Sequence, residues 1–256
     1  KDQDRVETVT YRKDAQKAII RYVSTNGNRV LTTDEVTGKS GEAIAYSTTS
    51  QINEFKKQGY KLVSDEFTAG GAKVYDYDTA RDQVYTVTLS ERVEPVNPDN
   101  PTPQPNTPVN PGQPDSPRWP GTVENLDNKE SVSRTIHYVY EDGSKAKDDV
   151  VETLNFKRWS NVNLVTGHID FQDWTTNDDT FDKVVSPTIA GYTADKSEIP
   201  AVSGVQAKDQ DRVETVTYRK DAQKAIIRYV STNGNHVLTT DEVTGKSGEA
   251  IAYSTT

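Results

Sequence analysis

Alternating apolar and polar positions predict strands in the first part of the chain. Residues 18–23 and 85–89 each alternate in this way, which is typical of a strand with one buried face. The Asn-Gly-Asn turn at residues 26–28 follows the first of these strands and predicts a hairpin. Residues 60–63 predict another strand. This part of the chain is therefore expected to be rich in β-structure.

Between these strands the apolar spacing changes to that of a helix. Ile52 and Phe55 are three residues apart, which places both side chains on one helix face. Thr49 or Ser50 can cap the start of this helix, and Gly59 can end it. The pattern therefore predicts one short helix between two groups of strands.

The order of hairpin, helix and strands is typical of a β-grasp, ubiquitin-like module, and we expect residues 13–93 to form one. A second module is expected over residues 121–219, with strands at 135–140, 150–156 and 213–218. The two stretches share similar short segments in the same order, which indicates that they are related. The expected fold class is α+β and mostly β, with two such modules in tandem.

A long internal repeat sets the organisation of the chain. Residues 1–49 recur at 208–256 with a single Arg-to-His difference, which is typical of a recently duplicated array. Residues 1–12 then correspond to the last strand of a preceding repeat, and residues 220–256 to the start of the next one. Neighbouring repeats are therefore predicted partners, and the exposed strand edges could pair with a neighbouring chain.

The segment between the two modules, residues 94–120, contains ten of the twelve prolines. Proline at a spacing of about three favours a polyproline II helix, which has three residues per turn. The segment is therefore expected to be an extended linker, spanning up to roughly 80 Å at about 3.1 Å per residue, within an elongated array. A ligand for a proline-recognising domain is the alternative interpretation.

Composition removes several classes of function. The formal net charge of −9 disfavours nucleic acid, because binding to phosphates requires clustered Lys and Arg. The absence of Cys removes disulfides and thiolate chemistry. No apolar run reaches the roughly 18 to 20 residues that cross a bilayer, so no membrane insertion is expected.

Several motifs together resemble the mucin-binding (MucBP, Mub) repeat family. They are the Ser-Pro-Thr-Ile-Ala-Gly-Tyr-Thr run within residues 181–195, the Ile-Pro pair at 199–200, the strand at 213–218 and the upstream segment 136–143. The resemblance covers nearly all of residues 130–219. It implies a secreted protein of lactobacilli and related bacteria, anchored to the cell wall through regions outside this sequence, that attaches cells to host mucus. It further implies mucin glycoproteins as partners and, as for some family members, immunoglobulins.

Tryptophans beside polar side chains suggest where a glycan could bind. Trp159 and Trp174 are accompanied by Asn161, Gln172 and Asp173. Aromatic faces can stack on the apolar side of a sugar ring while amide and carboxylate groups hydrogen-bond its hydroxyls. These five residues are the candidate ligand-binding residues, although aromatic residues in a β-sheet core are the plainer interpretation.

An acidic run in the second module is a candidate calcium site, and calcium is the one candidate cofactor. Its residues are Asp170, Asp173, Asn177, Asp178, Asp179 and Asp182. Their oxygens are suitable ligands for a hard cation, but the run lacks the spacing and glycine of an EF-hand loop. Solvated loop carboxylates are the alternative interpretation.

The residues indicate a binding protein rather than an enzyme. His168 lies near Asp170 and Asp173, but no serine-containing triad pattern accompanies it. No pair of carboxylates is marked for glycosidase chemistry. The expected function is non-covalent binding of mucin glycans by many weak sites, where avidity compensates for low affinity. A structural stalk and an immunoglobulin-binding module are the alternatives.

Overall fold

The computed structural model describes residues 4–113 and 115–254, and the chain divides into two compact units. The first unit is Lys1–Asn128 with Arg158–Asp173, and the second is Lys129–Lys157 with Trp174–Thr256. Residues 158–173 therefore fold with the N-terminal part of the chain rather than with their sequence neighbours.

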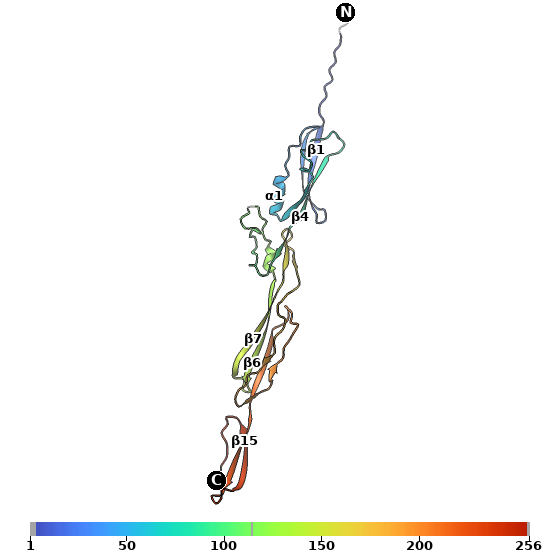
Figure 1. Ribbon diagram of the computed structural model, residues 1–256. Helices are drawn as coiled ribbons and strands as arrows, with labels where there is room; N and C mark the ends of the chain where they lie inside the picture. The colour runs from blue at the N-terminus through green and yellow to red at the C-terminus, as the bar shows by residue number, and fades with distance from the viewer. Residues whose placement is uncertain (1–3, 114, 255–256) are drawn as a thin grey trace. The chain divides into compact units, whose positions relative to one another are not determined.

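A four-stranded mixed sheet with one helix forms the first module (Figure 1). The elements are β1 (Ala15–Ser24), β2 (Val30–Lys39), α1 (Thr49–Lys57), β3 (Tyr60–Asp65) and β4 (Gln83–Glu91). The strand order is β2-β1-β4-β3, with β1 parallel to β4 and the other pairs antiparallel. The predicted hairpin, helix and strands are confirmed in their order.

The core of this module lies between the sheet and α1. Ala18, Ile20 and Tyr22 on β1 are fully buried, and α1 contributes Ile52 and Phe55. The ring centroids of Tyr22 and Phe55 are 5.6 Å apart. Because successive strand residues face opposite sides, the predicted alternation places these apolar side chains on the covered face.

The start of the helix differs from the prediction. Neither Thr49 nor Ser50 caps it: the N-cap is Thr48, and its side chain makes no capping hydrogen bond. The Thr48 hydroxyl instead donates to the Asp65 carboxylate at 2.6 Å. A tertiary partner on β3 has therefore taken the place of the local cap. The helix ends as expected, with Gly59 at a φ of +94° after the C-cap Gln58.

A small sheet follows in the first unit. Its strands are β5 (Val93–Val96), β8 (Ser160–Asn163) and β9 (Ile169–Phe171), in the order β5-β8-β9 with both pairs antiparallel. A short 3₁₀ helix, η1 (Gly121–Asn125), packs near it through Val123. Segments that are far apart in sequence therefore share this sheet.

The proline-rich segment is not the extended linker that the sequence predicts. It folds back on itself, because Asn106 N donates to Trp119 O at 2.9 Å and Trp119 N donates to Thr107 O at 3.0 Å. Val109 N also donates to Pro117 O at 2.9 Å. Val109 and Trp119 pack against the apolar cluster of Val96, Val123, Val162 and Leu164. Burial of these two side chains favours a compact loop over an open polyproline helix.

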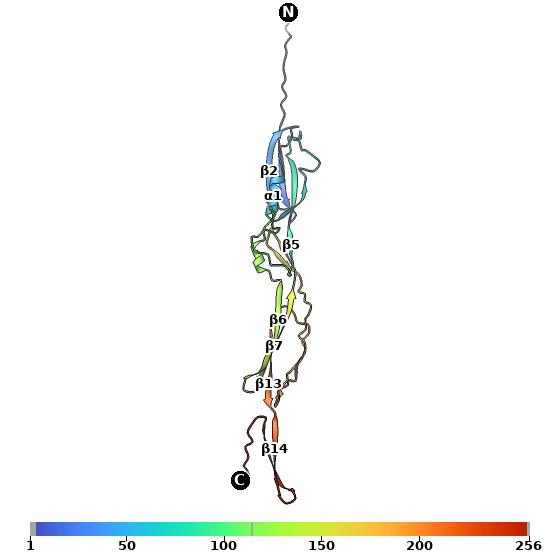
Figure 2. The same cartoon turned by 60° about the vertical axis from the view of Figure 1, so that its left-hand side comes forward.

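The second unit is built on another four-stranded sheet (Figure 2). Its strands are β6 (Lys129–Tyr140), β7 (Lys145–Lys157), β11 (Tyr192–Ala194) and β13 (Arg212–Lys220), in the order β11-β13-β6-β7. The β6–β13 pair is parallel and the others are antiparallel. Strands are thus confirmed at all three predicted places.

No α-helix lies between β7 and β13, all of which is described, so a β-grasp fold is not confirmed for this module. Irregular segments with the short pair β10 (Val184–Val185) and β12 (Glu198–Ile199) occupy that stretch. Side chains from this stretch pack against the sheet in two clusters, through Phe181 and Val205 in one and Ile199 in the other. Side-chain packing of irregular chain therefore covers the sheet where a helix was expected.

Arg134 ties part of this irregular chain to β6. Its guanidinium is 1% exposed and lies 2.5 Å from the Glu152 carboxylate on β7. It also donates to the backbone carbonyls of Pro200, at 3.0 Å, and of Asp182. The guanidinium lies 5.1 Å from the ring centroid of Phe181. A buried charge needs partners of this kind, and here they come from both the sheet and the covering segment.

The duplicated sequence occurs in two different structural contexts. In the C-terminal copy, the equivalents of β1 and β2 pair as a two-stranded hairpin of β14 (Ala222–Val230) and β15 (Val237–Lys246). Ile20 is fully buried in the first copy, whereas the equivalent Ile227 is only partly buried. Residues 4–12 form no strand, although the same sequence forms most of β13. Partner strands, rather than local sequence, decide both differences.

Candidate functional site

One face of the β8–β9 pair gathers polar side chains beside an exposed tryptophan. Asn161 and Asp170 are directly paired in register. Trp159 precedes β8, Gln172 follows β9, and Gln172 N donates to Trp159 O at 2.9 Å. Because side chains alternate with a period of two and cross-strand partners share a face, all four side chains lie on the same side of the pair.

This face is open to solvent. Trp159 is 43% exposed, whereas Ser160 and Val162, which point to the opposite side, are fully buried. Asp170 and Gln172 are exposed and Asn161 is half-buried. An aromatic ring with amide and carboxylate groups around it can stack on a sugar and bond its hydroxyls. The structure thus brings three of the five predicted ligand-binding residues together, with Asp170 as a fourth partner.

The other two predicted ligand-binding residues do not join this face. Asp173 is exposed at the end of the first unit, and Trp174 belongs to the second unit. Trp174 packs against the core cluster that contains Phe156 and Phe181. The Lys208 ammonium lies 5.4 Å from its ring centroid. Trp174 is therefore partly buried against this cluster and lies apart from the β8–β9 face.

The acidic run does not form a metal-binding cluster. Within residues 4–113 and 115–254, no three acidic or histidine side chains come together as a metal site. The two residues Asp170 and Asp173 lie in the first unit, and Asn177, Asp178, Asp179 and Asp182 lie in the second. Local turns use two of the carboxylates, because Asp178 accepts from Thr180 N at 2.9 Å and Asp179 from the Thr180 hydroxyl at 3.0 Å. Calcium binding stays a sequence-based prediction that this geometry does not support.

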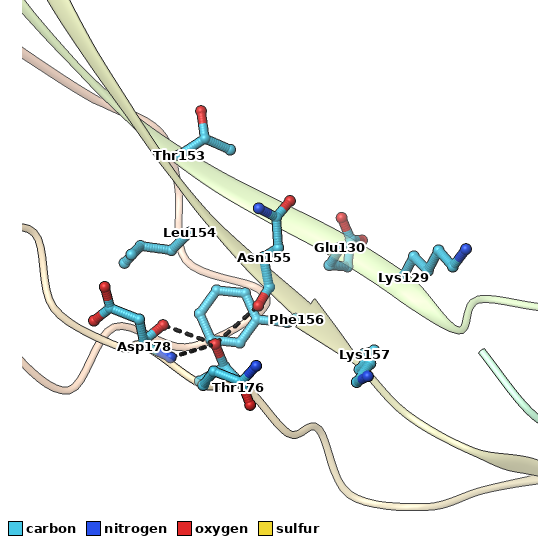
Figure 3. Close-up of a pocket in the computed structure, with 10 residues that line it drawn as sticks. Lys129, Glu130, Thr153, Leu154, Asn155, Phe156, Lys157, Thr176 and Asp178 are labelled. Carbon is cyan, nitrogen blue, oxygen red and sulfur yellow. Dashed lines mark hydrogen bonds between the residues drawn. The ribbon is translucent and has the colours of Figure 1, made fainter. Parts of the chain in front are cut away.

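A pocket of about 410 Å³ lies in the second unit (Figure 3). Lys129 and Glu130 at the start of β6 line one part of it, and residues 153–157 at the end of β7 line another. The loop at residues 176–178 closes the third side. Concave sites with an apolar floor and a few polar groups are typical of small-ligand binding.

The alternation of β7 gives this pocket its two kinds of surface. Leu154 and Phe156 are 6% and 5% exposed and contribute its apolar part, while Asn155 and Lys157 are exposed. The Thr176 hydroxyl holds the loop in place, lying 2.8 Å from the Asn155 carbonyl oxygen (Figure 3). Asn155 and Lys157 are not among the residues predicted to bind a ligand. The alternating strand pattern over 150–156 is the signal that places Asn155 on an open face.

Three family models match most of the chain. A mucin binding domain family matches residues 16–91, a Muc B2-like domain family matches residues 123–222, and the MucBP domain family matches residues 224–256. No curated protein matches the chain.

Two solved structures of mucus-binding repeats resemble the chain over most of its length. The crystal structure of Mub-RV is 26% identical, covers 80% of this chain and 99% of its own, and has a TM-score of 0.64. The type 2 repeat of the mucus binding protein MUB from Lactobacillus reuteri is 28% identical, covers 80% and 100%, and has a TM-score of 0.52.

These matches define the chain as a β-rich, non-enzymatic binding module. The chain belongs to the mucin-binding (MucBP/Mub) repeat family, and it is a repeat of a mucus-binding adhesin. Domains of this family occur in surface-exposed adhesins of Gram-positive bacteria, which places the chain outside the cell. Among the residues that the structure describes, no helix is long and apolar enough to span a bilayer.

Proposed function

We propose that this repeat binds mucin glycans non-covalently through the β8–β9 face. The observation that carries the proposal is the exposed Trp159 with Asn161, Asp170 and Gln172 on the same side of the strand pair. The net charge of −9 disfavours long-range attraction to acidic glycans. Stacking and short-range hydrogen bonds are then the main source of affinity, and both are available on this face.

The pocket of the second unit is a further glycan site in this proposal. Its exposed Asn155 can donate and accept hydrogen bonds, and the Phe156 side chain provides an apolar surface beside it. The β8–β9 face and the pocket would each bind a glycan weakly by itself. Repetition along the adhesin, presented from the cell wall by other parts of the protein, would raise the overall affinity through a high effective concentration.

Binding of the purified chain to immobilised mucin, before and after enzymatic deglycosylation, tests this function. Loss of binding on deglycosylation is the expected result, and unchanged binding would contradict glycan recognition. Immunoglobulin on a parallel surface separates glycan binding from protein capture. Binding to neither surface would favour a structural stalk.

Two substitutions test the site. Trp159→Ala is expected to weaken mucin binding severalfold, because it removes the stacking surface without opening a core. Tyr77→Ala is the matched control, since Tyr77 is also an exposed aromatic residue, at 78%, and lies outside both candidate sites. Equal binding by both variants would exclude the β8–β9 face. Asn155→Ala tests the pocket in the same assay.

A further inference from the structure

Each module begins and ends on two adjacent parallel strands. In the first module, β1 and β4 are paired over seven registered positions, from Ala18 with Gln83 to Ser24 with Leu89. In the second, β6 and β13 are also paired over seven, from Arg134 with Arg212 to Tyr140 with Tyr218. The first and last long strands of each module are therefore direct hydrogen-bonding neighbours.

This topology determines how a module responds to tension along the chain. Force enters at the N-terminal end of the first strand and leaves at the C-terminal end of the last strand. Because the two strands are parallel, these points are at opposite ends of the pair, and the force shears one strand along the other. The evenly spaced hydrogen bonds of a parallel pair then share the force, and several must break together.

The β14–β15 hairpin would respond differently. Its strands are antiparallel, and Ala222 at the start of β14 is paired with Lys246 at the end of β15. Force entering and leaving there acts at the same end of the pair. The hydrogen bonds then break one after another, as in unzipping, which requires a much lower force.

Burial protects the sheared strands from water. Ile20 and Tyr22 on β1 and Leu89 on β4 are fully buried. In the second module Ile136 and Val216 are likewise fully buried, and Tyr138 and Tyr218 are each 1% exposed. Water cannot easily compete for backbone hydrogen bonds that such side chains cover, and a hydrogen bond is stronger in a low-dielectric surrounding.

We propose that both modules are mechanical clamps that transmit pulling force without unfolding. This function goes beyond the proposed binding function and does not depend on it, because it rests on strand topology and burial alone. It suits an adhesin, since a cell attached at one end of an array experiences drag that the repeats must carry.

Single-molecule pulling on the first module tests the proposal. The chain contains no Cys, so engineered cysteines are unique attachment points. Arg12→Cys with Val93→Cys applies force at opposite ends of the β1–β4 pair and shears it. Thr25→Cys with Val93→Cys applies force at the same end and peels it. Arg12, Thr25 and Val93 are all exposed, with Val93 at 51% exposure.

The second module offers an equivalent pair of attachments. Lys129→Cys with Arg219→Cys shears β6 against β13, and Glu141→Cys with Arg219→Cys peels them apart. All three residues are exposed, and the Arg219–Glu141 ion pair of 3.6 Å that is lost is a surface pair of little energetic value. Equal melting temperatures of the variants and the parent chain establish that each remains folded.

The expected result is an unfolding force severalfold higher in the shearing geometry than in the peeling geometry for each module. Equal forces in the two geometries would overturn the proposal. Pulling the unmodified chain by its two ends gives a reading without internal substitutions. There we expect a low-force unfolding event from the β14–β15 hairpin, followed by high-force events from the two modules. The absence of the high-force events would also overturn the proposal.

Discussion

The duplicated hairpin allows one substitution to be made in two contexts of identical local sequence. Gly38 on β2 and Gly245 on β15 are equivalent positions, and neither has a positive φ. A Cβ added at Gly38 would lie 2.2 Å from Cε2 of Tyr75, whereas the nearest atom to a Cβ at Gly245 is a Glu249 carboxylate oxygen 4.0 Å away. Tyr75 is 3% exposed and belongs to the core of the first module.

Gly38→Ala is therefore expected to destabilise the first module, because the buried Tyr75 ring has to move. Overpacking of this kind costs about 1–3 kcal/mol, which corresponds to a fall of roughly 5–15 °C in the melting temperature of a domain of this size. Gly245→Ala meets open space and is expected to be neutral, or to stabilise its strand by about 0.5–1 kcal/mol, because Ala loses less backbone freedom than Gly.

Differential scanning calorimetry of both variants measures the effect. Hydrogen exchange of residues 83–91 assigns it, because this segment belongs to β4 and has no second copy in the chain. Faster exchange there is expected for Gly38→Ala alone. Equal effects of the two substitutions would refute the packing argument, and so would a Gly38→Ala variant that melts like the parent chain.

Three further predictions follow from burial and charge. Ile20→Ala should lower the free energy of unfolding by denaturant by about 2–5 kcal/mol, because it opens a core cavity. Ile227 is only partly buried, so Ile227→Ala should lower it by about 1 kcal/mol. Equal losses for the two variants would contradict the assigned burial. Arg134→Ala should lower the stability of the second unit by about 3 kcal/mol, since it breaks a buried pair with Glu152. A urea midpoint equal to that of the parent chain would contradict this prediction. Burial, and then a hydrogen bond to a neighbouring carboxylate, raise the pKa of Tyr46. The unfolded chain then loses its Tyr proton first, near pH 10. The contribution of Tyr46 to stability should therefore be constant from pH 7 to about pH 10 and decline above it. Tyr46→Phe should weaken this decline in melting curves recorded from pH 7 to 11.

The candidate site was predictable in part. The sequence placed Trp159 among polar residues, but only the pairing of β8 with β9 shows that Asn161 and Asp170 share a face with it. Trp174 has a similar local sequence context, yet it is partly buried against a core cluster, and the Lys208 ammonium lies near its ring. Exposure of an aromatic residue depends on contacts distant in sequence, which residue types nearby do not encode.

The sequence alone determined most strands of the two four-stranded sheets, the short helix, the repeat and the family, because these depend on local periodicity and on residue order. The tertiary structure decided which copy of a repeated segment forms a strand and which copy is buried. Residues 4–12 have no partner strand and form none, whereas residues 211–219 contribute to β13 between β6 and β11. The proline-rich loop shows the same dependence, since Val109 and Trp119 fold back only because an apolar cluster from β5, β8 and η1 receives them. A strand needs a neighbour for its hydrogen bonds and an apolar side chain needs a surface to cover it, and long-range contacts supply both.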